Sequence, residues 1–305
     1  MAGTKEIKGR IKSIKDTQKI TNAMYMIAST KMRKAKNELD RTRPYFNALR
    51  AEIKRLFRIE SNLESRYFYP ADGSHVEETT YGLLVITADK GLAGAYNQNV
   101  IKQAQKMLEQ HPDTKLFVVG EYGRRFFVKK KIPIEQTFLY TAQNPTMQRA
   151  REISSLLLSG FDRGELGKIF IIYTDLLSGM QEEATVTRLL PFHRSHFVDE
   201  IDERPIKDPF EFIPDLKTVL ETGVRSYVSG FIYSALVDSF CSEQNARMEA
   251  MSAANDNAEK MLAQLSVQYN RVRQAAITQE ITEVSAGAKA QKKKRLKEAA
   301  RNANR

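Results

Sequence analysis

Apolar and small residues recur near the N-terminus of the chain at alternating steps of four and three positions. This spacing is the heptad repeat of a coiled-coil helix, and it predicts one helix over residues 4–57. Pro44, the only proline in that range, is where such a helix can kink. Gln18 and Thr21 bury little apolar surface, so a partner helix must approach closely there. The repeating positions are Ile7, Ile11, Ile14, Gln18, Thr21, Tyr25, Ala28, Met32, Ala35, Leu39 and Thr42.

A second repeat of this kind fills the C-terminal part of the chain, where residues 212–288 contain no proline after Pro214. It predicts another long helix, which Gly223 and Gly230 allow to bend. Together the two helices suggest an antiparallel coiled coil that closes on itself, although each could instead pair with another protein. The second stripe is rich in alanine, as close backbone approach requires. It runs through Ala246, Ala250, Ala253, Asn257, Met261, Leu265, Gln268, Val272, Ala275 and Gln279.

Between these helices, short apolar runs alternate with helical patterns. The runs cover residues 81–87, 115–120 and 168–174, and the helical patterns cover 95–110, 121–131 and 146–161. Such alternation predicts an α/β fold with a largely parallel sheet, here a small Rossmann-like domain, to which residues 183–191 add a half-exposed strand. The predicted parts are an N-terminal long helix (1–58), a linker (59–80), a central α/β domain (81–194), a linker (195–214), a C-terminal long helix (215–290) and a basic helical tail (291–305).

Composition excludes several classes of protein. The chain has 305 residues, 42% of them hydrophobic, which is too apolar and too long for a wholly disordered protein. Its one cysteine, Cys241, excludes an intramolecular disulfide framework and a CxxC metal or redox site. No run approaches the roughly 18 apolar residues of a membrane-spanning helix, and the start lacks the apolar core of a secretory signal. We therefore expect a soluble intracellular protein with no direct membrane span.

Positive charge is concentrated at the two ends of the chain. Residues 1–58 hold 16 Lys and Arg against 5 Asp and Glu, and residues 291–305 hold 7 against 1. The stretch between them is mildly acidic, with 25 against 31. Basic ends suit nucleic acid, an anionic membrane surface or acidic protein partners, and equally the solvated faces of helices.

The turn Asp89–Gly94 follows the first predicted strand and precedes a helix, a place where backbone amides can hold phosphate. Neither the P-loop pattern nor the dinucleotide pattern GxGxxG is present. We therefore interpret Asp89 as the N-cap of the helix that follows, with the glycines forming a tight turn.

Other chemically suggestive residues do not form a complete site. His193 and His196 give an HxxH pair, half of a zinc site, without a further ligand at the usual spacing. His75 and His111 fall in predicted loops, and Cys241 falls on the second long helix as a small core residue. Lys292–Arg295 would suit a polyanion or a solvated tail. We find no catalytic constellation, and we expect no cofactor and no metal.

Three distinctive segments follow one another along the chain: residues 7–36, TADKGLAGAYN at 87–97 and ITQEITEVSAGA at 277–288. Together they resemble one family, the gamma subunits of F-type ATP synthases. The first is similar to the N-terminal helix of that family, the second resembles its strand–turn–helix, and the third is similar to its C-terminal signature. The chain departs from the family pattern at Ala88 and Ala93, where Ser and Cys are common, and it continues for 15 residues after Ala290.

The resemblance implies a rotor that couples proton flow through a membrane ring to ATP synthesis or hydrolysis. It implies as partners the alpha and beta subunits of the catalytic ring, the epsilon subunit and the proton-carrying membrane ring, without nucleic acid. It also implies a peripheral location on the cytoplasmic side of a cell membrane, and a chain that is not an enzyme by itself. Rival hypotheses are a basic coiled-coil protein that binds nucleic acid and a nucleotide-dependent α/β enzyme.

By the same resemblance, seven residues would contact the moving loops of the beta subunits. The expected contact residues are Lys19, Met24, Arg273, Gln274, Thr278, Glu280 and Glu283.

Two expectations concern the long helices themselves. Replacing Ala253 or Ala275 by leucine is expected to overpack the predicted coiled coil. We expect the second helix to continue through residues 291–305, either as an inhibitory contact with the catalytic ring or as a passive solvated extension.

Overall fold

The computed structural model describes residues 3–59, 65–69, 80–176, 182–193 and 211–303. The chain divides into two compact units. One contains residues 1–25 and 251–305, which we call the paired-helix unit. The other contains residues 26–250, which we call the sheet unit.

Both long helices are present, as the heptad repeats predict. Helix α1 spans Thr4–Ile59 and includes Pro44, and helix α5 spans Leu216–Ala303. The second helix begins at Leu216, one residue after the start of the predicted part 215–290 and four after the start of the repeat at 212, because Asp215 acts as its N-cap, accepting a hydrogen bond from the Thr218 backbone N–H at 2.9 Å. The predicted helical tail is confirmed as far as Ala303.

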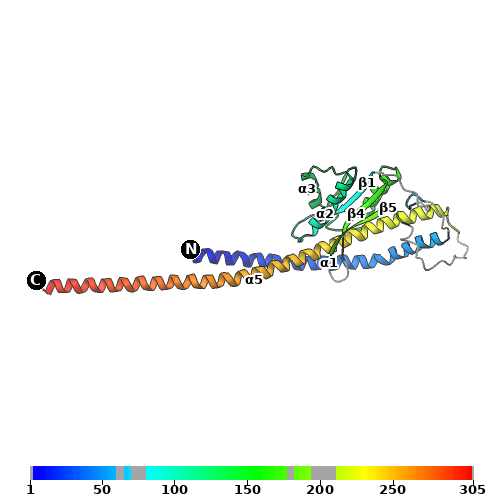
Figure 1. Cartoon of the computed structure of the whole chain (residues 1–305). Helices are drawn as coiled ribbons and strands as arrows, with labels where there is room; N and C mark the ends of the chain where they lie inside the picture. The colour runs from blue at the N-terminus through cyan, green and yellow to red at the C-terminus, as the bar shows by residue number, and fades with distance from the viewer. Residues whose placement is uncertain (1–2, 60–64, 70–79, 177–181, 194–210, 304–305) are drawn as a thin grey trace. The chain divides into compact units, whose positions relative to one another are not determined.

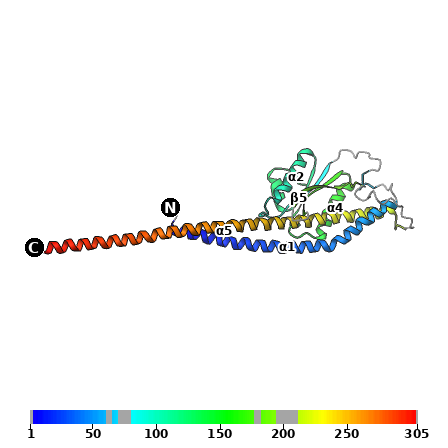
Figure 2. The ribbon, with the colours of Figure 1, turned by 60° about the horizontal axis from the view of Figure 1, so that its bottom comes forward.

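In the paired-helix unit, α1 and α5 run antiparallel and lie side by side (Figures 1 and 2). Thr21 donates to Asn255, and Gln18 donates to Glu259 at 3.5 Å, so residue numbers on the two helices run in opposite directions. On α1 the predicted positions from Ile7 to Thr21 are buried or half-buried, whereas Tyr25 is exposed and its neighbour Met24 is half-buried.

The predicted stripe on α5 is wrong by one residue over much of this unit. Ala253, Asn257, Met261, Gln268, Ala275 and Gln279 are all exposed. The structure buries a neighbouring stripe because alanines occupy several faces of α5, and spacing alone cannot tell which face meets α1. The residues that pack are Met251, Ala254, Ala258, Leu262, Leu265, Tyr269 and Val272.

The sheet unit contains a five-stranded sheet in the order β3-β2-β1-β4-β5. Strands β1 to β4 are parallel and β5 is antiparallel to β4, so the largely parallel sheet is confirmed. Strand β3 was not predicted, because its three residues are too few to give a pattern. The strands are β1 (Tyr81–Ile86), β2 (Lys115–Val119), β3 (Gln136–Phe138), β4 (Lys168–Leu176) and β5 (Glu182–Leu190).

Helices cover both faces of this sheet. On one face, α2 (Tyr96–Gln110) and α3 (Glu121–Lys129) pack against Leu83, Val85 and Val118. On the other, α4 (Met147–Asp162) and the α1 and α5 segments of this unit pack against Leu84, Ile86 and Ile171. The sheet is therefore buried on both faces, which explains why its strands are continuous apolar runs.

Part of the predicted linker 59–80 is packed in the sheet unit. Tyr67 and Phe68 are buried, and Phe192 donates its backbone N–H to the Tyr67 carbonyl at 2.8 Å. The Tyr69 N–H donates in turn to the Phe192 carbonyl at 3.0 Å. Residues 60–64, 70–79 and 194–210 of the two predicted linkers lie outside the described residues.

Candidate functional site

The C-terminal segment of α5 has no α1 beside it. Extending the Thr21–Asn255 and Gln18–Glu259 pairs to the start of α1 brings Thr4 level with residue 272 or 273. Among the α5 residues up to 295, whose burial the structure describes, Val272 is the last that is not exposed, and residues 273–295 are all exposed. Within the described part of this unit, α5 therefore continues as a single helix from Arg273 (Figure 1). We call residues 273–288 the free segment.

Five of the seven expected contact residues fall on this free segment, and all five are exposed. On α1, Lys19 is exposed and forms a surface ion pair with Asp16 at 3.3 Å. Met24 is half-buried, so it is less accessible to a partner than the resemblance implied. The five residues on α5 are Arg273, Gln274, Thr278, Glu280 and Glu283.

An exposed apolar stripe on the free segment was missed by the sequence reasoning. Ile277, Ile281 and Val284 are 45%, 64% and 73% exposed, and they follow one another at steps of four and three residues. These steps place them on one face of the helix. The four–three spacing was visible in the sequence, but the exposure of these side chains depends on where α1 begins. Three large apolar residues on one face of an unpaired helix indicate a surface that a partner covers.

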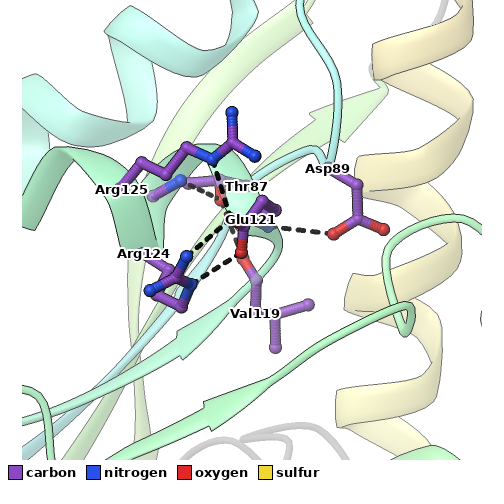
Figure 3. A network of polar contacts seen from close by, with 7 residues as sticks. Thr87, Asp89, Val119, Glu121, Arg124 and Arg125 are labelled. Atoms are coloured by element: carbon purple, nitrogen blue, oxygen red, sulfur yellow. Dashed lines mark hydrogen bonds and ion pairs between the residues drawn. The ribbon is translucent and has the colours of Figure 1, made fainter.

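The turn after β1 caps a different helix from the one we predicted. Asp89 accepts a hydrogen bond from the Glu121 backbone N–H at 2.9 Å, at the start of α3 (Figure 3). Helix α2, which follows Asp89 in the sequence, has Ala95 at its N-cap position. The prediction that Asp89 caps the following helix is therefore wrong, because in a parallel sheet the loops that follow two adjacent strands meet at one edge.

Glu121 ties together the start of α3. Its carboxylate accepts hydrogen bonds from Arg124 at 2.6 Å and from Arg125 at 2.7 Å (Figure 3). These bonds lower the pKa of Glu121 to about 2. Thr87 on the neighbouring loop donates to the Val119 carbonyl and accepts from the Gly123 N–H. Within the described residues, Asp89 Oδ2 is buried without a hydrogen-bond partner, whereas Thr87 and Glu121 bond to groups within the network, which is typical of a structural role.

The turn also packs against α5, at the point where ligands bind in open α/β sheets. Strand order reverses between β1 and β4, and the crevice at the carboxyl ends of such strands is the usual ligand site. Here Arg247 of α5 donates to the Gly91 carbonyl at 3.1 Å, and Ala246 packs with Ala88 and Ala93. Ser239 accepts from the Thr174 N–H at the end of β4. The chain's own helix therefore occupies this position.

Two buried charges stabilise this contact. Glu243 and Arg247 lie one turn apart on α5, are almost fully buried, and form an ion pair at 2.6 Å. Burial raises the pKa of Glu243, while Arg247 opposes that shift. Arg247 thus joins a buried carboxylate to the Gly91 carbonyl, and the pair fastens the turn to the helix.

The remaining candidate residues have packing contacts. His193 stacks on Tyr69, with ring centroids 4.7 Å apart, and His111 lies 4.4 Å from the Tyr81 ring. His75 and His196 lie outside the described residues. Cys241 is buried in the core, as predicted, and burial raises its pKa to about 12. The described residues contain no group of three or more metal-ligating side chains.

None of the described helices contains an apolar stretch long enough to cross a bilayer. The free segment carries Glu280 and Glu283 beside its apolar stripe.

A coiled coil built from both ends of one chain, with an α/β domain between the two helices, defines a structural class of stalk-like subunits. Within that class, the family model described as ATP synthase matches residues 3–291. The chain belongs to the family of ATP synthase gamma chains. The gamma chain of Acetivibrio thermocellus is 40% identical over 297 residues, covering 96% of this chain and all of that protein. The sodium-ion-specific gamma chain of Acetobacterium woodii is 34% identical over 299 residues, covering 93% and 97%.

Solved structures share the fold of this chain. A chain from the Euglena gracilis mitochondrial ATP synthase matches with a TM-score of 0.66 at 17% identity, covering 94% of both chains. A chain from the central stalk and c-ring structure of the Tetrahymena thermophila enzyme matches with a TM-score of 0.59 at 23% identity. It covers 77% of this chain and 99% of that one. These similarities concern the fold.

Proposed function

We propose that this gamma chain is the rotating central stalk of a membrane-associated ATP synthase, in which it couples ion flow through a membrane ring to catalysis in the beta subunits. The coupling ion we propose is the proton. The family includes the sodium-ion-specific relative from Acetobacterium woodii, so ATP-driven proton pumping with and without sodium is the measurement that decides between the two ions.

The exposed free segment of α5 is the observation that carries this proposal. Residues 273–295 are exposed without exception, and they include an apolar stripe with charged neighbours. A segment of this kind is stabilised by a surrounding partner rather than by its own chain. In the proposed assembly that partner is the ring of three alpha and three beta subunits.

We propose that the beta-subunit loops contact Lys19, Met24, Arg273, Gln274, Thr278, Glu280 and Glu283. The exposure of six of these residues supports the set. Met24 is half-buried, so it offers less exposed surface to such a contact. To this set we add the apolar stripe Ile277, Ile281 and Val284, which offers more area to bury than the polar residues beside it.

A stalk in which one helix continues alone beyond a helix pair can act differently on three identical catalytic subunits. The contact surface has no threefold symmetry, so each beta subunit meets a different face of it. Shifting a subunit from 1:99 to 99:1 between two conformations requires about 5.5 kcal/mol of differential contact. Rotation offers that difference to each subunit in turn.

The sheet unit has a different proposed role. We propose that it contacts the epsilon subunit and the proton-carrying ring, on the cytoplasmic side of a cell membrane, as a peripheral component. Because α5 occupies the ligand crevice of the sheet, we also propose that the chain is not an enzyme by itself. We expect the purified chain to hydrolyse no ATP, and turnover that is lost on mutating Asp89 or Lys90 would contradict this.

Co-expression with alpha and beta subunits tests the function. We expect the chain to co-purify with both as one complex that hydrolyses ATP. Exchanging Ile277, Ile281 and Val284 for serine should weaken that complex, whereas the same exchange at Val128, Leu139 and Leu156, which are exposed on the sheet unit, should not. A chain that remains alone and binds duplex DNA with a steep salt dependence would favour the nucleic-acid hypothesis instead.

A further inference from the structure

The middle of the paired-helix unit is held by polar side chains. Asn255 of α5 is half-buried and uses both ends of its amide on α1. Its Oδ1 accepts from the hydroxyl of Thr21, and its Nδ2 donates to Asn22 Oδ1 at 2.5 Å. One turn further along α5, Glu259 accepts from Gln18 at 3.5 Å. We call Thr21, Asn22 and Asn255 the polar clasp.

The polar clasp interrupts an apolar seam. On α1 the seam residues Ile7, Ile11 and Ile14 are buried or half-buried, but the next two seam positions hold Gln18 and Thr21. Between residues 15 and 25 no apolar side chain of α1 is buried, so the polar clasp takes the place of apolar packing there. On α5, Asn255 belongs to a stripe whose steps alternate between four and three. The other members of that stripe are Met251, Ala258, Leu262, Leu265, Tyr269 and Val272.

A neighbouring apolar residue competes for the place of Thr21. Ile20 comes directly before it on α1 and is 61% exposed. Turning α1 about its axis by about 100°, the angle between successive residues, would put Ile20 in that place, and burying its side chain would be favourable. Because the polar clasp joins Asn255 to two successive residues of α1, such a turn cannot keep both hydrogen bonds.

The loss of these hydrogen bonds opposes the turn. A half-buried amide left without a partner costs free energy, and one polar residue in an otherwise apolar coiled-coil seam selects one arrangement of the helices at a cost in stability. Any turn is confined to residues 15–25, since Ile7, Ile11 and Ile14 hold the rest of α1 in this unit. The observed arrangement, with Ile20 exposed, is the one that satisfies the amide of Asn255.

We propose that Asn255 is a positioning residue, which fixes the rotation of α1 about its own axis in the paired-helix unit. It thereby decides which side chains α1 turns outward beside the polar clasp. One of these is Lys19, which is exposed and belongs to the proposed beta-loop contacts. The effect of Asn255 on catalysis rests on the proposed function, whereas its effect on α1 is a property of the chain alone.

Two variants of the full chain separate positioning from stability. Asn255→Leu removes the amide and places an apolar side chain in the seam, where Ile20 is a better neighbour than Thr21. The urea midpoint of unfolding is expected not to fall, because Thr21 Oγ1 also lies 3.0 Å from the Gln18 carbonyl and Asn22 is exposed to water. Adding Thr21→Val to Asn255→Leu supplies an apolar neighbour at position 21 and should restore the original rotation without any polar clasp.

The rotation is read from the rate at which a water-soluble maleimide labels Ile20→Cys. Cys241 contributes little labelling, since it is buried and burial raises its pKa to about 12. Asn255→Leu is expected to slow labelling at position 20 by about three- to tenfold, because the side chain there becomes buried. Adding Thr21→Val should return the rate to that of the parent. The control Asn257→Leu, an exposed change on another face of α5, should leave it unaltered.

An unchanged labelling rate in folded Asn255→Leu would overturn the proposal. So would a slowed rate that Thr21→Val does not reverse, since the loss would then not depend on which α1 residue fills the seam. Circular dichroism of each variant shows that the chain is folded.

The consequence for catalysis is tested in the assembled complex with alpha and beta subunits. Asn255→Leu and Lys19→Gln are each expected to slow ATP hydrolysis by about two- to fivefold, and the two together by no more than Asn255→Leu alone. Lys19→Gln/Asn257→Leu should match Lys19→Gln. Effects of Asn255→Leu and Lys19→Gln that multiply would overturn the link between these two residues. A parent complex that fails to assemble would instead contradict the proposed function and leave the labelling result on α1 intact.

Discussion

Single residues decide how the sheet is fastened to α5. Arg247 donates both to the carboxylate of Glu243, one turn before it on α5, and to the carbonyl of Gly91 in the turn after β1. The contact with Gly91 cannot be inferred from spacing, because Gly91 lies more than 150 positions from Arg247. The i, i+4 spacing of Glu243 and Arg247 was visible in the sequence, but their burial was not.

Removing Arg247 should therefore be costly. The change Arg247→Gln leaves a buried carboxylate without its partner, and we expect the free energy of unfolding to fall by about 3–5 kcal/mol. Urea denaturation followed by circular dichroism measures it. The control Arg125→Gln breaks the exposed pair with Glu121 and should cost less than about 1 kcal/mol. Equal effects of the two changes would contradict the structural role of the buried pair.

Asp238 gives a pH dependence of the opposite sign to that of most carboxylates. Burial and the nearby Asp175 raise its pKa to about 6, while hydrogen bonding from Ser234 and the charge of Arg43 act against the shift. A raised pKa stabilises the fold below the unfolded value of 3.8, and this contribution is lost as the pH rises towards 6.

We therefore expect Asp238→Asn to be more stable than the parent at pH 7, by on the order of 2 kcal/mol, with the difference disappearing near pH 4. Denaturation curves at several pH values measure this. Asp256→Asn, an exposed change on the same helix, should leave the parent's profile unaltered. If the stability difference between the parent and Asp238→Asn were the same at pH 4 and pH 7, Asp238 would not have a raised pKa in the folded chain.

At the scale of elements, both long helices and most strands could be predicted, because heptad spacing and continuous apolar runs are properties of the sequence itself. The packed stripe of α5 could not. Its alanines offer two neighbouring stripes, and only contact with α1 selects the one through Ala254 and Ala258. The pairing of strand β3 and the helix that Asp89 caps likewise depend on which segments become neighbours in the folded chain.

The selected stripe can be tested with two alanines. Ala258 is buried beside α1, so Ala258→Leu should overpack the helix pair and cost about 1–3 kcal/mol. Ala253 is exposed, so Ala253→Leu should change stability by less than about 0.5 kcal/mol. Urea denaturation of the two variants compares them. If Ala253→Leu lowered stability more than Ala258→Leu, the packed stripe would instead be the one expected from the sequence.

Two glycines of α5 should respond in opposite ways to alanine. A Cβ at Gly230 would clash with the ring of Phe46 on α1, so Gly230→Ala should displace that ring and cost about 1–3 kcal/mol. At Gly223 the nearest atom is 3.8 Å away, so Gly223→Ala should gain about 0.5–1 kcal/mol from helix propensity. Thermal unfolding distinguishes them, and a stabilising Gly230→Ala would contradict the close approach of α1 and α5.

At the scale of the whole molecule, the family and the class of fold could be predicted from three motifs in order along the chain. The candidate contact surface could be predicted only in part. Sequence similarity predicted the contact residues from Arg273 to Glu283. The apolar stripe at Ile277, Ile281 and Val284 could not be predicted to be exposed, because its exposure depends on α1 beginning at Thr4 and so not reaching it. The position at which α5 changes from a paired to a single helix is set by two segments from opposite ends of the chain, so neither segment alone reveals it.

The central claim, that this chain turns inside a catalytic ring, is tested most directly by watching it turn. The measurement fixes an assembled complex of the chain with alpha and beta subunits to a surface through the beta subunits and attaches a visible probe to an exposed site on α3. With ATP supplied, the account predicts rotation in one direction with three stops per turn, one for each beta subunit. A complex that hydrolyses ATP while the probe shows only undirected Brownian motion would contradict the account.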